Sequence, residues 1–189
     1  QEPQRRGVSA FAFAMLGILV YVGFRFRFSF GVGAIIAVVH DILVTLAMLT
    51  FFGYDLSLNV VAAMLTITGY SVNDSIVVFD RVRENLRQMR RDAFDVLVNT
   101  SINQTLSRTI ITSGTTAFAV LALYVAGGEV LRGFAFTMLV GVISGTYSTI
   151  FIAAAAAIVI SERRATRRAE SIERSVAVAK SKRRPKKTR

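Results

Sequence analysis

The chain contains no cysteine and a single histidine, His40, and these shortages exclude several kinds of site. Without cysteine there can be neither a disulfide framework nor a thiolate metal site. One histidine cannot form a histidine cluster, and no other residue completes a serine–histidine–acid arrangement. The sequence also lacks a G-x-x-x-x-G-K-[ST] phosphate loop, an H-E-x-x-H motif and a metal-ligand cluster. We therefore expect no enzyme activity, no cofactor and no metal.

Long apolar runs dominate what is present. The 189 residues are 53% hydrophobic with a net charge of +11 and a mean hydropathy of +0.51, a combination that soluble domains do not show. Five runs are long enough to cross a bilayer as helices, and each is broken by charge or glycine. They cover about residues 8–24, 31–52, 58–79, 109–126 and 131–160. The sequence predicts an all-α membrane protein with a transmembrane bundle over residues 1–160.

The positions of lysine and arginine predict the orientation. One set of connections carries Arg25, Arg27 and five arginines between residues 81 and 91, and the basic tail, residues 161–189, belongs to the same side. The opposite side has short turns with Arg132 and two arginines at the start of the chain. Because positively charged connections stay in the cytoplasm, we expect the N-terminus outside and the C-terminus inside.

Two segments are expected to lie at the cytoplasmic surface. Residues 80–107 carry apolar side chains at helical spacing between charges, which indicates an amphipathic helix at the interface or a solvated helical linker. The tail, residues 161–189, is basic and would attract anionic lipid headgroups with about 1 kcal/mol per charge near the surface. Because orientation and lipid anchoring account for these charges, we expect no nucleic-acid partner.

The third run contains an acid that needs an explanation. Asp74, next to Asn73, is the only charged residue between positions 60 and 79. An ionised aspartate near the middle of a transmembrane helix costs about 2.5–3.5 kcal/mol on insertion scales. A residue with that cost is paired, lines a wet cavity or carries protons.

Arg108 is the predicted partner of Asp74. It opens the fourth run, on the same helical stripe as Thr112, and the two antiparallel helices bring it to the depth of Asp74. A structural ion pair is one interpretation, although such pairs stabilise weakly compared with apolar substitutes. A functional pair is the other, because acids that face a membrane bundle usually serve function. A modest helix movement could then switch Asp74 between binding and releasing a proton.

The second run holds another acid, Asp41, beside His40, about ten residues into the helix. His40 is of the residue type that titrates near neutral pH, so a proton relay through this pair is one hypothesis. Hydrogen bonding to a neighbouring helix or to a partner subunit is the other.

Small residues form two rows in the last run. Gly141 and Gly145 are four residues apart, as are Ser144 and Ser148. Rows of small residues let helix backbones approach closely in a membrane. We expect this face to pack against another helix.

Three stretches resemble one family. Residues 69–85, GYSVNDSIVVFDRVREN, resemble the fourth-helix signature of the SecF family of bacterial protein-export membrane proteins, and residues 40–70 and 99–116 resemble its neighbouring helices. The resemblance implies five helices of a six-helix permease-like half bundle in the bacterial cytoplasmic membrane, within the resistance-nodulation-division superfamily. It also implies pairing with SecD, work beside the SecYEG translocon and use of the proton-motive force for protein export. Asp74 then matches the family's proton-carrying aspartate and Arg108 its intramembrane arginine.

The chain also departs from that family. A first helix and a periplasmic domain, through which the translocating preprotein would be contacted, are expected before the five runs, whereas this sequence opens QEPQRRG. We therefore expect it to be the later part of a longer protein. Two alternatives remain: a proton-driven exporter of drugs or lipids from the same superfamily, and a non-transporting scaffold for the translocon.

Overall fold

The computed structural model describes residues 2–25, 28–89 and 92–182, and it contains only helices and turns within those ranges. Residues 26–27, 90–91 and 183–189, which include part of the expected basic side and tail, lie outside the described residues. The elements are α1 (Glu2–Arg25), α2 (Phe28–Phe51), α3 (Leu58–Gln88), α4 (Phe94–Ala126), α5 (Gly128–Ser148), the π-helix η1 (Thr149–Ala153) and α6 (Ala154–Lys182).

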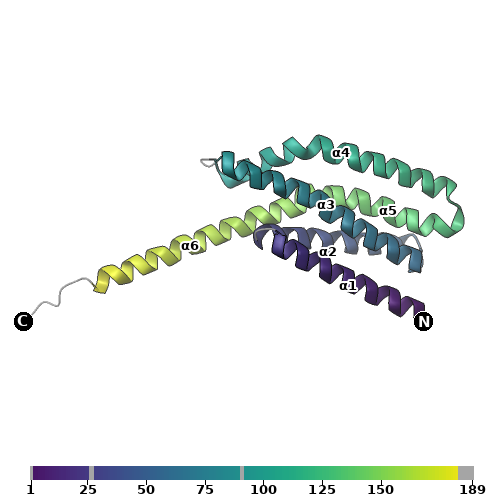
Figure 1. Ribbon diagram of the computed structural model, residues 1–189, viewed down its shortest axis with the longest axis horizontal. Coiled ribbons are helices and arrows are strands. Elements are labelled where there is room, and N and C mark those ends of the chain that lie inside the picture. The colour runs from purple at the N-terminus through teal and green to yellow at the C-terminus, as the bar shows by residue number, and fades with distance from the viewer. Residues whose placement is uncertain (1, 26–27, 90–91, 183–189) are drawn as a thin grey trace, which may run out of the picture.

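The bundle is organised around α3 and α5. Helix α5 packs against α2, α3 and α4, and α3 also contacts α1, so these two helices form the centre (Figure 1). Helix α6 continues α5 through η1 and then extends away from the bundle (Figure 1). The centre of the bundle is therefore where α3 presents its polar residues.

The all-α membrane class is confirmed. Among the described residues, four helical stretches are long and apolar enough to cross a membrane: Ser29–Phe51, Leu58–Gln88, Phe94–Ala126 and Gly128–Arg164. Helix α1 contributes a shorter apolar stretch, Ser9–Phe24. That the chain crosses the membrane five times, and in which orientation, remains a prediction.

The segment 80–107 differs from the expected interfacial helix. Helix α3 runs on to Gln88 and α4 already begins at Phe94, so most of the segment is made of the ends of two long antiparallel helices. Val82 and Leu97 are buried there, and the Asn85 amide donates to Ser101 Oγ at 2.8 Å. These contacts hold the two ends against each other, because the apolar side chains of the segment are buried inside the bundle.

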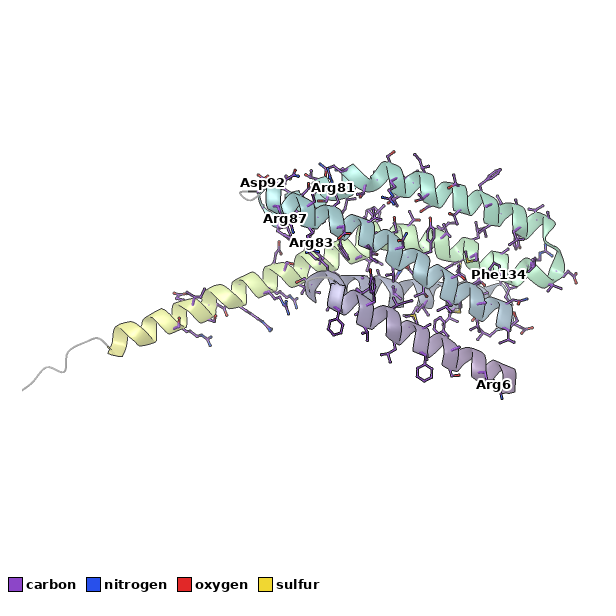
Figure 2. The ribbon with its side chains drawn as sticks, viewed as in Figure 1. Arg6, Arg81, Arg83, Arg87, Asp92 and Phe134 are labelled. Atoms are coloured by element: carbon purple, nitrogen blue, oxygen red, sulfur yellow. The ribbon has the colours of Figure 1, made fainter. Side chains whose placement is uncertain are left out.

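Arginines gather at this end of the bundle. Figure 2 shows Arg81, Arg83 and Arg87 near the α3–α4 turn, whereas Phe134 lies at the opposite end. Arg81 also donates from Nε to Gln104 Oε1 at 2.6 Å, which adds a further link between α3 and α4. The charge asymmetry found in the sequence is thus an asymmetry between the two ends of the bundle.

The small residues of α5 lie against α3. A Cβ atom added at Gly141 would overlap the Ile67 side chain, with Cγ2 at 2.7 Å and Cβ at 2.8 Å, and one at Gly145 would lie 3.1 Å from Ser71 Cβ. Such distances leave no space for a larger residue at Gly141. The two helices approach as closely as the row of small residues predicts.

Candidate functional site

Asp74 lies on the side of α3 that faces α4. Its side chain is buried, with the residue 9% exposed, and the Thr109 hydroxyl donates to its Oδ1 atom at 2.9 Å. Its Oδ2 atom is buried and has no hydrogen-bond partner in the part of the chain that the structure describes. A buried carboxyl oxygen without a partner is unfavourable, so its presence here calls for an explanation.

A cavity of about 310 Å³ opens beside Asp74. It lies between two helices and is lined by Tyr70, Asn73, Asp74 and Val77 of α3 and by Arg108, Thr112, Thr115 and Thr116 of α4. This volume is large enough for water molecules. The Asp74 carboxyl group and the Arg108 guanidinium group thus line one cavity.

Arg108 is not in direct contact with Asp74. Within the described residues, no ion pair of 4.0 Å or shorter joins the two, although both line the cavity. The direct partner of the carboxylate is instead Thr109, the neighbour of Arg108 on α4. The sequence predicts Asp74 and Arg108 at one depth, and in the structure the cavity lies between their side chains.

Asn73 and Thr112 belong to the same cavity. Asn73 is exposed, and the Thr112 hydroxyl donates to the Arg108 backbone carbonyl at 2.9 Å. Because this bond stays within α4, Thr112 contributes a polar wall and no link to α3.

Asp41 occupies a different environment. It is 4% exposed, and the hydroxyls of Ser71, Ser144 and Ser148 donate to its oxygens at 2.6, 2.8 and 2.7 Å. The neighbouring His40 Nδ1 lies 3.2 Å from Oδ1. Asp41 therefore connects α2 to α3 and α5 by hydrogen bonds, which corresponds to the packing hypothesis more closely than to a relay.

Sequence reasoning missed Thr109 and the serines around Asp41 as site residues. The serine row on the last helix was visible, but a row of small residues does not identify which acid it meets. Thr109 follows Arg108 directly and carried no separate signal. The assignment of Thr109 required the packing of two helices, and that of the serines required the packing of three.

The comparisons with known proteins agree on one family. The family model "Protein export membrane protein SecD/SecF, C-terminal" matches residues 1–163. The "Protein translocase subunit SecF" of Desulfurispirillum indicum is 51% identical over 155 residues, which are 80% of this chain and 49% of that protein. The "Protein translocase subunit SecDF" of Thermus thermophilus is 47% identical over 164 residues, 87% of this chain and 22% of that protein.

A solved structure shares the fold. The crystal structure of SecDF in a super-membrane-facing form matches with a TM-score of 0.77 and 48% identity, over 81% of this chain and 21% of that one. This chain spans about half the length of the SecF relative named above. The chain belongs to the SecD/SecF family of protein-export membrane proteins, whose C-terminal membrane region it matches.

Proposed function

We propose that this chain is the membrane part of a SecF-type subunit that uses the proton-motive force to promote protein export across the bacterial cytoplasmic membrane. The observation that carries the proposal is Asp74, a buried acid with one unpartnered oxygen, beside a cavity that also holds Arg108. Family membership supports protein export as the process that this site serves.

Proton binding at Asp74 is the proposed step. A proton that enters through the cavity neutralises the carboxylate and removes its attraction to Arg108 across that space. Thr109 serves both states, because a hydroxyl donates to an ionised carboxylate and also accepts from a neutral one. The bundle arrangement favoured by the neutral acid then gains population over the other. The driving force is about 2.3 kcal/mol per charge per 100 mV plus about 1.36 kcal/mol per pH unit.

SecD is the proposed partner within the membrane. The matched SecDF protein and SecDF structure carry SecD and SecF in one name. Helix α4 offers a large apolar surface for such a partner, because Ile110, Ile111 and Phe118 are exposed on it. We further propose the SecYEG translocon and the translocating preprotein as partners of the complete protein.

The basic residues of α6 are proposed to meet anionic lipids. The helix leaves the bundle (Figure 1) and carries Arg163, Arg164 and Arg167 just beyond its apolar start. Positive charges at this position attract anionic headgroups and keep the segment on the cytoplasmic side.

The test is gradient dependence in the complete protein. In vesicles that contain the full-length subunit with SecD and SecYEG, Asp74→Asn should assemble normally but export preprotein at a rate that no longer responds to the proton gradient. Asp55→Asn, which changes an exposed acid in the α2–α3 turn, is the matched control and should retain the response. A normal response in Asp74→Asn would refute the proton-carrier role, and loss of SecD from the variant complex would favour the scaffold alternative.

A further inference from the structure

The hydroxyl cluster around Asp41 lies one helix face away from Asp74. We define this cluster as Asp41 with Ser71, Ser144 and Ser148. On α3, Ser71 precedes Asp74 by three residues, so the two side chains project from adjoining faces of one turn. Whatever fixes Ser71 therefore also fixes the direction in which Asp74 projects.

Both oxygens of Asp41 act as acceptors. Ser71 and Ser148 donate to Oδ2, and Ser144 donates to Oδ1. These O···O distances of 2.6–2.8 Å are normal for hydroxyl hydrogen bonds to oxygen. A single amide oxygen cannot replace this arrangement, because two separate acceptor atoms are used.

The π-helix η1 begins directly after the cluster. Ser148 and Thr149 are consecutive and fully buried, and Thr149 Oγ1 lies 3.1 Å from Ser75 Oγ on α3. Single π turns inside α-helices recur at functional positions. Here the α5–η1 junction contacts Ser75 directly through Thr149, and it meets Ser71 through the shared acceptor Asp41. Ser71 and Ser75 stand on either side of Asp74 in the sequence of α3.

Close packing of the helix backbones further restricts how the helices can rotate against one another. Gly145 stands against Ser71, where an added Cβ would lie 3.1 Å away. Gly33 of α2 stands against the Ala153 carbonyl of η1, where an added Cβ would lie 2.6 Å from the oxygen. Helices α3 and α5 thus meet closely at the level of the cluster, and α2 meets η1 closely about two turns away.

We propose that Asp41 is a positioning residue for Asp74: through Ser71, Ser144 and Ser148 its carboxylate sets the rotation of α3 against α5, so that Asp74 is held at the Arg108 cavity. A buried acid is a poor choice where packing alone is needed, because apolar residues of similar volume usually stabilise as well. The value of the carboxylate is that it accepts from two helices at once and fixes their mutual rotation. The consequence for export rests on the proposed function, whereas the effect on α3 does not.

The absence of cysteine from this chain allows the rotation of α3 to be measured directly. In a cysteine-free full-length complex with SecD in membrane vesicles, Asn73→Cys places one thiol at the cavity, where Asn73 is exposed. The rate at which this thiol reacts with a maleimide reports how accessible that face of α3 is from the cavity. The measurement needs no proton gradient. The second readout is the pH at which dicyclohexylcarbodiimide labels half of Asp74, located by peptide mass spectrometry.

Asp41→Asn should change the maleimide rate at position 73 and shift the pH midpoint of Asp74 labelling, while SecD still co-purifies. Ser144→Ala and Ser148→Ala, which each remove one donor, should move both readouts in the same direction by less. Thr137→Val is the matched control, because Thr137 is buried on α5 but bonds only to the Gly133 carbonyl of its own helix at 2.7 Å. That control should match the parent.

Parent-like values for both readouts in Asp41→Asn would overturn the proposal. If Asp41→Asn fails to assemble, the two serine variants decide: unchanged readouts in both overturn the positioning role, and changed readouts support it. Failure of the proton-carrier role is recognised separately, because Asp74→Asn would then keep gradient-dependent export while the thiol at position 73 still responded to Asp41→Asn.

Discussion

Replacing Gly141 by alanine tests how closely α3 and α5 must approach. The added methyl group would overlap Ile67, whose Cγ2 and Cβ atoms would lie at 2.7 and 2.8 Å from it. Ile67 is itself 2% exposed, so it has no free space into which to move. Overpacking of this kind costs about 1–3 kcal/mol.

The matched control is Gly69→Ala on α3. An added Cβ at Gly69 meets nothing within 4 Å, so only the helix preference for alanine, about 0.5–1 kcal/mol, remains. Both variants share that gain, and the clash alone separates them. For a chain of this size a difference of about 1–3 kcal/mol corresponds to roughly 2–12 °C in Tm.

The assay is thermal unfolding of the purified full-length complex in one detergent, followed by circular dichroism. Gly141→Ala should unfold at a lower temperature than Gly69→Ala. Ile67→Ala should cost less in the Gly141→Ala background than in the parent, because the two sites are in contact. Equal Tm values for the two glycine variants would refute the close packing of α3 and α5 on which the position of Ser71 depends.

Two further predictions concern the ends of the bundle. Asn85→Leu should destabilise the α3–α4 end by about 1–3 kcal/mol, because it removes the donor to Ser101 Oγ at 2.8 Å and Gln104 Oε1 at 2.9 Å. Faster amide exchange at the start of α4 would show this loss, and unchanged exchange would contradict it. At the opposite end, Tyr54→Phe should cost only about 0.5–1.5 kcal/mol, because it deletes the hydroxyl contact to Tyr124 at 3.1 Å and keeps the ring stacked on Phe136 at 4.6 Å. A decrease in Tm as large as that of Tyr54→Ala would contradict the prediction that the ring contributes more than the hydroxyl.

The apolar runs were sufficient to predict the helical membrane class, because length and hydropathy alone distinguish a spanning helix. The common depth of Asp74 and Arg108 was also predicted, because antiparallel helices bring residues to similar depths, whereas the cavity between their side chains was not. The helix ends were not predicted: α3 and α4 extend well past their apolar runs, and Val82 and Leu97 in these extensions are buried in the core of the bundle.

The polar contacts inside the bundle were beyond sequence reasoning. Thr109, and not Arg108, bonds to Asp74, a difference of one residue that depends on the rotation of α4. The cluster at Asp41 combines residues more than 100 positions apart, and it lies directly before a π turn that no local pattern predicts. Each of these features is set by the mutual rotation of helices, which hydrophobic periodicity defines only coarsely.

Proton movement through the complete complex is the most direct test of the role of Asp74. Proton entry should be recorded with a pH-sensitive dye inside vesicles that carry the full-length subunit, SecD and SecYEG, during preprotein export under an imposed gradient. We predict that proton entry accompanies export in the parent and in Asp55→Asn and is absent in Asp74→Asn. Equal proton entry in the parent and in Asp74→Asn would contradict it.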